Sequence, residues 1–290
     1  MYNAVDWSPP ALPAEIPHGD MPGDKVFITD EHVSKSGTIF QRLRKLSNFA
    51  DKVVISVYGG SGVGKSEIAS ILAYYFRCAG IGAYVMSGDN YPYRIPKYND
   101  AERLSIFRDH GLRGLVEAEL YTLERFELLS QWMGADDDAN PIHAEKNPWF
   151  TEYLRAGGAA LTNYLGTDKE IDFDQVSGII RSFKEKREGI YLKRMGREET
   201  ELWYEYVDFS AINVLILEWT HGGSEFLRGV DIPVYLHSTP EETLAHRKSR
   251  SRDGKTDSPF TTLVLRIEQE KLQKQSRNAA IILSKSGVIE

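Results

Sequence analysis

The stretch that limits most strongly what this chain can fold into covers residues 53–70, which read VVISVYGGSGVGKSEIAS. It begins with an apolar, β-branched run that is typical of a buried strand, and glycines end this run from Gly59 onward. After Lys65, apolar residues recur at intervals of three and four positions, which places them on one face of a helix. The sequence therefore predicts a strand, a glycine-rich turn and a helix in direct succession.

The turn has the pattern Gly-x-x-x-x-Gly-Lys-Ser, from Gly59 to Ser66, which is the complete Walker A motif. Its glycines let backbone N–H groups point at phosphate oxygens, and the helix adds the partial positive charge of its N-terminus. Lys65 is expected to neutralise the β- and γ-phosphates of ATP, and the Ser66 hydroxyl to bind Mg²⁺. A plain Gly/Ser-rich turn is disfavoured because motif, strand and helix agree. The expected nucleotide-binding residues are Gly59, Gly60, Ser61, Gly62, Val63, Gly64, Lys65, Ser66 and Glu67.

Composition and charge exclude several other classes of protein. The chain has 290 residues, and its formal net charge of −7 argues against a general binder of nucleic acids or anionic membranes. The single cysteine, Cys78, cannot form an intrachain disulfide, which fits a reducing compartment. Neither a signal peptide nor an apolar run of transmembrane length is recognisable. We expect a cytoplasmic protein without nucleic-acid or membrane partners, and the sequence leaves homo-oligomerisation open.

Two acids follow apolar runs that are expected to be core strands. Residues 83–87 come after the Walker A helix and end just before Asp89, and residues 213–218 end in Glu218, in the manner of a Walker B strand with Glu in place of Asp. A helix between two strands predicts a right-handed parallel crossover, which brings the carboxyl ends to one edge. Asp89 is the leading candidate for the general base; the alternatives are a cap of the turn or a ligand of a magnesium-bound water. With Ser66, the two acids form the expected magnesium site.

The remaining patterns divide the chain into four segments. We expect an N-terminal arm and helix over 1–50, a first part of the core over 51–96, an acceptor-binding helical insertion with a hairpin over 97–209, and a second part of the core over 210–290. The expected helices cover residues 38–49, 101–110, 112–133, 149–165, 173–187 and 260–277. Hairpin strands are expected on both sides of residues 195–199, and further strands over 25–28, 231–236 and 279–283.

A basic cluster, residues 246–255, contains three arginines and two lysines. By itself such a cluster is typical of a solvated helix end. Here the cluster follows a core strand and a helix in a chain that has a Walker A motif. This position indicates that residues 246–258 form a lid. Guanidinium groups on a lid can stabilise the charge that develops during phosphoryl transfer, which makes Arg247, Arg250 and Arg252 catalytic candidates.

These pieces together resemble the P-loop kinases of the uridine kinase and phosphoribulokinase family. The resemblance rests on GGSGVGKS, on Asp89 with Tyr91, on LILEW, on DIPVYLHSTPEETLAHRKSRSRD and on the terminal AAIILSKSGVI, which cover half of the chain. It implies an α/β, three-layer α/β/α P-loop NTPase fold with a five-stranded parallel sheet. It also implies ATP-dependent phosphorylation of a hydroxyl, with Asp89 as the base and the three arginines on the lid.

Two departures from the family leave the acceptor open. Trp219 follows Glu218 where family members usually have glycine, so a bulky ring replaces a residue that lets the substrate approach. The Ser-Gly-Asp-Asn string at residues 87–90 also resembles the Asp-Gly-Asp-Asn motif of adenylylsulfate kinases, although Ser87 replaces the first acid. Adenylylsulfate is therefore an alternative acceptor to a nucleoside, a sugar or a related metabolite.

The acceptor is expected to bind where the strand ends and the hairpin meet. The candidate residues are Tyr91, Tyr93, Arg94, Arg194, Arg197, Glu218, Trp219 and His221. Each has a plainer interpretation as core aromatic or solvated cation, and their convergence on one edge is what favours a site. Arginines there would suit an anionic acceptor.

Three functions are consistent with this pattern. The first is a small-molecule kinase. The second is a nucleotide-binding regulatory protein whose helical insertion docks a partner protein. The third, an NTPase motor, is disfavoured because no convincing apolar strand ends in Asp.

Overall fold

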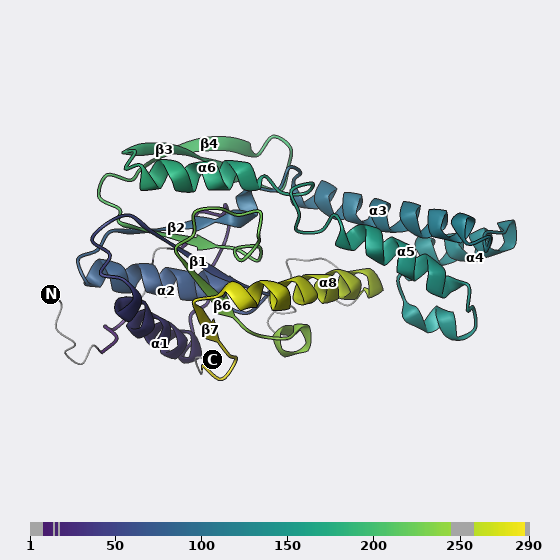
Figure 1. Cartoon of the computed structure of the whole chain (residues 1–290), viewed down its shortest axis with the longest axis horizontal. Helices are drawn as coiled ribbons and strands as arrows, with labels where there is room; N and C mark the ends of the chain where they lie inside the picture. The colour runs from purple at the N-terminus through teal and green to yellow at the C-terminus, as the bar shows by residue number, and fades with distance from the viewer. Residues whose placement is uncertain (1–7, 14, 17, 245–257, 288–290) are drawn as a thin grey trace. The chain divides into compact units, whose positions relative to one another are not determined.

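The computed structural model describes residues 8–13, 15–16, 18–244 and 258–287. The chain folds into two compact units (Figure 1). Unit 1 comprises Met1–Tyr91, Asp172–Thr243 and Leu272–Glu290, and unit 2 comprises Pro92–Ile171 and Leu244–Lys271. The lid predicted at residues 246–258 lies outside the described residues except for its last position, and Arg247, Arg250 and Arg252 are not among those described.

Unit 1 is built on a five-stranded sheet in which every neighbouring pair is parallel. The strands are β1 (Val53–Gly59), β2 (Ala83–Ser87), β5 (Val214–Glu218), β6 (Ile232–Leu236) and β7 (Ile281–Leu283), and their order is β2-β5-β1-β6-β7. Each strand is an almost continuous apolar run, as expected when both faces of a parallel sheet are covered. The predicted five-stranded parallel α/β fold is confirmed.

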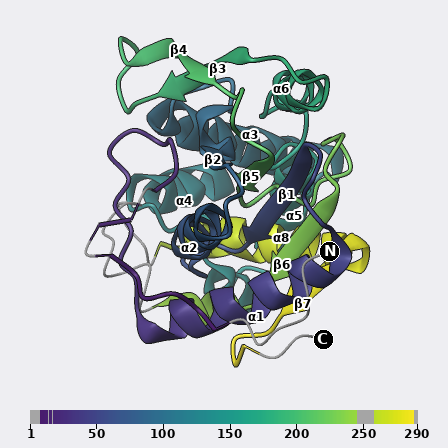
Figure 2. The same cartoon turned by 90° about the vertical axis from the view of Figure 1, so that its left-hand side faces the viewer.

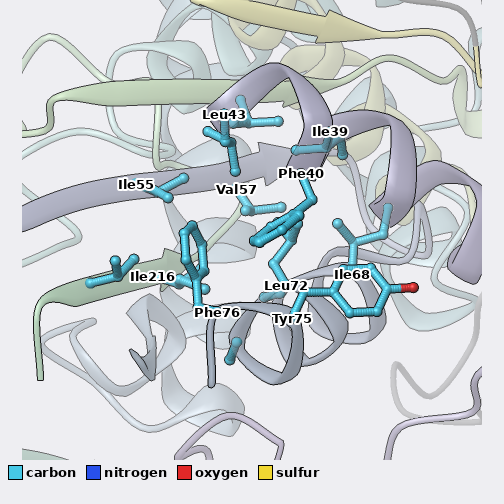
Figure 3. Packing of buried hydrophobic residues seen from close by; sticks show 14 of the residues in the cluster. Ile39, Phe40, Leu43, Ile55, Val57, Ile68, Leu72, Tyr75, Phe76 and Ile216 are labelled. Atoms are coloured by element: carbon cyan, nitrogen blue, oxygen red, sulfur yellow. The ribbon is translucent and has the colours of Figure 1, made fainter. Parts of the chain in front are cut away.

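One face of this sheet packs against helices α1 (Asp30–Leu46) and α2 (Lys65–Cys78). Figure 3 shows Phe40 of α1 and Phe76 of α2 pointing toward one another beside Val57 of β1. The two rings meet edge to face with centroids 5.0 Å apart. On the other face, Tyr58 contacts Leu272 of α8 (Pro259–Gln275). Helical layers on both sides therefore complete the three-layer arrangement.

The N-terminal boundary of α1 differs from the prediction, which placed the helix at residues 38–49. The helix begins at Asp30, because Thr29 is its N-cap and the Thr29 N–H donates to Nδ1 of His32 at 3.2 Å. Acidic residues in its first turn also favour this start. The short strand predicted at residues 25–28 is absent, since these described residues take no part in a strand.

The predicted β-hairpin is confirmed as β3 (Gly189–Met195) and β4 (Leu202–Asp208), but it does not group with the helical insertion. The hairpin and helix α6 (Phe173–Lys184) belong to unit 1 and lie next to one another in both views (Figure 1, Figure 2). The physical reason is a set of hydrogen bonds to the β2 end of the sheet. Arg194 donates to the Tyr84 hydroxyl at 3.0 Å, and the Met195 N–H donates to Oδ1 of Asn90 at 3.0 Å.

Unit 2 is helical among its described residues. It contains α3 (Pro96–Glu117), α4 (Leu123–Gly134), η2 (Pro141–Glu145), α5 (Phe150–Thr162) and part of α8. The break predicted at Gly111 is absent because that glycine is a contact point between α3 and α5. A Cβ at Gly111 would lie 2.6 Å from the Tyr153 ring, and one at Gly157 would lie 2.5 Å from the Phe107 carbonyl oxygen. These glycines allow the backbones of α3 and α5 to approach closely, and they do not end either helix.

Candidate active site

The Walker A loop, from Gly59 to Ser66, connects β1 to α2 in unit 1. Gly64 is the N-cap of α2 with φ of 91°, a left-handed conformation that favours glycine, and a Cβ there would lie 2.7 Å from Nε2 of His32. A Cβ at Gly59 would lie 2.5 Å from the Leu236 carbonyl oxygen of β6. Both motif glycines are thus required by close packing, and the loop places the N-terminus of α2 where it can receive phosphate.

Lys65 and Ser66 are the first residues of α2, and both side chains are largely buried. The Lys65 ammonium donates to the Gly60 carbonyl at 3.1 Å, so the lysine lies across its own loop. Glu67 is fully buried and its Oε1 accepts the Phe27 N–H at 3.4 Å. This contact favours a role for Glu67 in attaching the N-terminal arm to α2 over direct contact with a nucleotide.

The two predicted acids lie at the carboxyl ends of neighbouring strands. Glu218 at the end of β5 is in register with Ser87 of β2, and the Ser87 hydroxyl donates to Oε2 of Glu218 at 3.4 Å. Asp89 follows in the short helix η1 (Gly88–Asn90). Asp89 is exposed, whereas Glu218 and the flanking Gly88 and Asn90 are buried. Of the two acids, Asp89 is therefore the one accessible to a ligand.

Electrostatics place the acids and the Walker A residues in one cluster. Burial, and after it the charge of Asp89, raise the pKa of Glu218 to about 7. The Lys65 ammonium and a hydrogen bond with Ser66 act in the opposite direction. The structure thus brings together Lys65, Ser66, Asp89 and Glu218, which the sequence places far apart.

This donor set fits a magnesium ion that arrives with a nucleotide. Among the described residues, no group of three or more His, Cys, Asp or Glu side chains could hold a metal ion. Mg²⁺ commonly binds one hydroxyl or one or two carboxylates together with substrate phosphates and water. Ser66, Asp89 and Glu218 supply one hydroxyl and two carboxylates, so phosphate and water would have to complete the coordination.

Two predicted acceptor residues turn out to be part of the core. Tyr91 is fully buried, with its hydroxyl 3.9 Å from the Met86 sulfur. Trp219 is also buried, and it packs so closely on Gly88 that a Cβ there would overlap the indole. Its ring lies 5.1 Å from that of Phe173. Trp219 therefore supports the turn that carries Asp89, and neither ring offers a surface to an acceptor.

The other predicted acceptor residues are dispersed. His221 is partly buried, with its ring edge-on to Trp219. Arg197 is exposed in the hairpin turn, whereas the Arg194 guanidinium is only 4% exposed. Arg194 pairs with Asp20 and Glu205, both at 2.9 Å, which favours a structural role over acceptor binding.

Tyr93 and Arg94 belong to unit 2, whereas the other described acceptor candidates belong to unit 1. Tyr93 is exposed, and Arg94 donates to the Tyr164 hydroxyl at 3.1 Å and lies 3.5 Å from Glu102.

Sequence reasoning missed two charged residues near this cluster. Asp20, in the N-terminal arm, accepts the Ser87 N–H at 2.7 Å, and nothing in its Pro/Gly-rich surroundings signals this contact. Lys193 of β3 is only 7% exposed, and burial lowers its pKa while the charge of Asp172 offsets part of that effect. Alternation along the strand would place Lys193 on the same face as the exposed Tyr191, so the sequence carries no signal for the burial of Lys193.

Comparison with known proteins gives one curated relative with substantial identity. The chain is 39% identical over 259 residues to the bifunctional alpha-galactosidase/sucrose kinase AgaSK of Mediterraneibacter gnavus. The match covers 89% of this chain and 23% of that protein, so the chain spans about a quarter of the relative's length. No family model matches the chain.

Three solved structures match the chain at low identity, each with a TM-score below 0.5. A putative fructose transport system kinase from Silicibacter sp. TM1040 has a TM-score of 0.47 and 13% identity, covering 87% of this chain and 96% of its own. A possible uridine kinase from Bacillus stearothermophilus has a TM-score of 0.43 and 14% identity, covering 86% and 96%. D-glycerate 3-kinase from Cryptococcus neoformans has a TM-score of 0.46 and 12% identity, covering 90% and 98%.

A search of the described residues finds no helix that is both long and apolar enough to cross a membrane.

Proposed function

We propose that this chain is an ATP-dependent kinase that transfers the γ-phosphoryl group of ATP to a hydroxyl of a small molecule. The observation that carries the proposal is the cluster at the strand ends, where the Walker A residues lie beside a buried Glu218 and an exposed Asp89. A nucleotide-binding loop alone suits many functions. An exposed carboxylate beside it supplies the proton acceptor that transfer to a hydroxyl requires.

In the proposed reaction, the acceptor oxygen forms a bond to the γ-phosphorus while the bond to the β–γ bridging oxygen breaks. The hydroxyl proton passes to Asp89, and the products are ADP and a phosphate monoester. Lys65 neutralises phosphate charge, and the α2 N-terminus orients the phosphates. Ser66 and Glu218 would hold a magnesium ion that arrives with the nucleotide, and the ion would add positive charge beside the phosphates.

We further propose a sugar as the acceptor, with sucrose the first to test. The support is the Mediterraneibacter gnavus relative, whose name includes a sucrose kinase and whose match covers most of this chain. Because the chain carries a complete Walker A motif, the similarity is assigned to the kinase part of that name. A lid whose arginines Arg247, Arg250 and Arg252 stabilise the phosphates, and a cytoplasmic setting, remain part of the proposal from the sequence alone.

The test is acceptor-dependent release of ADP by the purified chain with ATP and Mg²⁺. The acceptors are sucrose, other sugars, uridine, glycerate and adenylylsulfate, and ³¹P NMR identifies the phosphate ester formed. We expect turnover with a sugar, and we expect Asp89→Asn to lower kcat by roughly 10²–10⁴-fold, the usual contribution of a general base. Glu199→Gln, an exposed change in the hairpin turn, is the matched control.

Two outcomes count against this proposal. If Asp89→Asn turns over the acceptor as fast as the wild type, the base assignment is wrong. If ATP binds but no acceptor stimulates ADP release, and a partner protein co-purifies in stoichiometric amount, the regulatory alternative replaces the kinase.

A further inference from the structure

A buried carboxylate outside the Walker A core contacts the turn that carries Asp89. Asp20 lies in the N-terminal arm, before α1, and its side chain is only 8% exposed. Its Oδ1 accepts the Ser87 N–H at 2.7 Å and the Asn90 side-chain amide at 3.3 Å. These two donors lie on either side of Asp89 in the sequence, so one oxygen of Asp20 holds both ends of the turn.

The second oxygen of Asp20 connects the same turn to the hairpin. Oδ2 accepts the Tyr84 hydroxyl at 3.0 Å and pairs with Nη1 of Arg194 in β3 at 2.9 Å. Arg194 also donates to the Tyr84 hydroxyl, which closes a ring of three side chains. The Asn90 amide adds a second link, because its Oδ1 accepts the Met195 N–H of the hairpin at 3.0 Å.

Burial makes this network rigid and keeps ligands out of it. Asp20 and Arg194 are both more than nine-tenths buried, so neither charge has a solvent alternative when its partner is lost. Asp89, in contrast, is exposed between the two residues that Asp20 holds. The two buried charges therefore hold the turn, and the carboxylate of Asp89 between its ends is exposed.

We propose that Asp20 is a positioning residue for Asp89, and that through Arg194 it holds the β3–β4 hairpin and the Asp89 turn in one fixed arrangement. This inference rests on the proposed function, because it gives Asp89 the role of base. Asp20 itself touches neither nucleotide nor acceptor. The N-terminal arm is thereby a component of the catalytic site and not an appendage of the core.

The two oxygens of Asp20 can be tested separately. Asp20→Ala removes all four contacts. Asp20→Asn retains one acceptor oxygen for Ser87 and Asn90. Its NH₂ group would face the guanidinium of Arg194, and both of these groups are hydrogen-bond donors. The double variant Asp20→Asn with Arg194→Gln removes that conflict, so its effect is expected to be smaller than the sum of the single effects. Glu15→Gln, an exposed charge removal in the same arm, is the matched control.

Three measurements follow each variant: acceptor-dependent kcat and KM, affinity for a fluorescent ATP analogue, and hydrogen–deuterium exchange by peptide. For Asp20→Ala we expect kcat to fall roughly 10²-fold, the cost of a misplacement of about 1 Å, with ATP affinity within twofold of the wild type. Exchange is expected to rise at residues 87–91 and to stay unchanged at residues 59–70. Asp20→Asn is expected to retain part of the lost kcat.

A kcat within twofold of the wild type, or unchanged exchange at residues 87–91, would overturn the proposal. The proposal would also be overturned if Asp20→Ala lowered ATP affinity as much as kcat and raised hydrogen–deuterium exchange at residues 59–70 as much as at residues 87–91. Asp20 would then stabilise the whole unit. If the wild type turns over no acceptor, the proposed function fails, and the exchange measurement alone decides whether Asp20 holds the turn.

Discussion

Glu218 gives a prediction whose magnitude follows from its surroundings. Its ordinary pKa is 4.5, and burial together with the charge of Asp89 raises the pKa to about 7 in the folded chain. At 1.36 kcal/mol per pKa unit, this difference corresponds to about 3 kcal/mol. Because the folded-state pKa is the higher one, the contribution of Glu218 to the free energy of unfolding is fully present below pH 4.5. This contribution is lost as the pH rises through 7.

Replacing Glu218 with Gln removes this titration and keeps a side chain of similar size. The wild type is therefore expected to lose stability between pH 5 and pH 8 relative to Glu218→Gln. With a shift of about 2–4 °C per kcal/mol, the difference between their melting temperatures should change by roughly 6–12 °C over that interval. Gln keeps one acceptor oxygen and carries an NH₂ group in place of the other, and any hydrogen bond with Ser66 or Ser87 that is lost lowers the variant's melting temperature at every pH. The change with pH is therefore the diagnostic quantity.

The assay is thermal unfolding followed by circular dichroism, without nucleotide and with a chelator, at intervals from pH 5 to pH 8. Glu199→Gln, an exposed change, controls for general effects of charge removal. A melting-temperature difference between wild type and Glu218→Gln that stays constant over this range would refute the reasoning. The carboxyl would then not be buried beside Asp89 in the folded chain.

Two further predictions concern the neighbouring glycines of α5 and the lysine of the Walker A motif. Gly157→Ala should destabilise the chain by about 1–3 kcal/mol, because its Cβ meets the Phe107 carbonyl, whereas Gly158→Ala, with nothing within 4 Å, should stabilise it by about 0.5–1 kcal/mol. Thermal unfolding measures both, and equal signs would contradict the packing argument. Lys65→Met should weaken binding of a fluorescent ATP analogue by roughly 10–100-fold, since it removes a charged hydrogen bond, with an unchanged circular dichroism spectrum. Unchanged affinity would exclude a phosphate-binding role for Lys65.

The sheet and the Walker A loop could be predicted because their determinants are local. Each core strand is a short apolar run bounded by turn residues, and the motif lies between a strand and a helix. The start of α1 has a signal in the sequence, since Thr29 is followed directly by two acids, whereas the apolar residues of the segment 38–49 alone predict a later start. A glycine at position 111 predicts a helix break from the sequence alone, whereas in the structure close contact with Tyr153 requires a glycine there.

The acceptor site could be predicted only in part, because a sequence does not show which neighbours of a motif are buried. Tyr91 and Trp219 follow the two acids directly, and aromatic residues there suit either a binding surface or the core. The structure buries both. Asp20 could not have been found, since its contacts with Ser87 and Arg194 join segments far apart in the chain and depend on the tertiary fold.

The sequence places both acids of the site at strand ends and favours Asp89 as the base, and the structure adds a difference in their burial. Glu218 is 4% exposed, and with a pKa of about 7 it holds its proton in a large fraction of nucleotide-free molecules at neutral pH. A protonated Glu218 carries no charge, so it does not repel the Asp89 carboxylate. Lys65 and Ser66 stabilise the ionised form of Glu218, and a bound magnesium ion would act in the same direction. In the proposed mechanism, burial therefore suits Glu218 to the nucleotide side of the site, and the exposed Asp89, whose turn Asp20 holds, faces the acceptor.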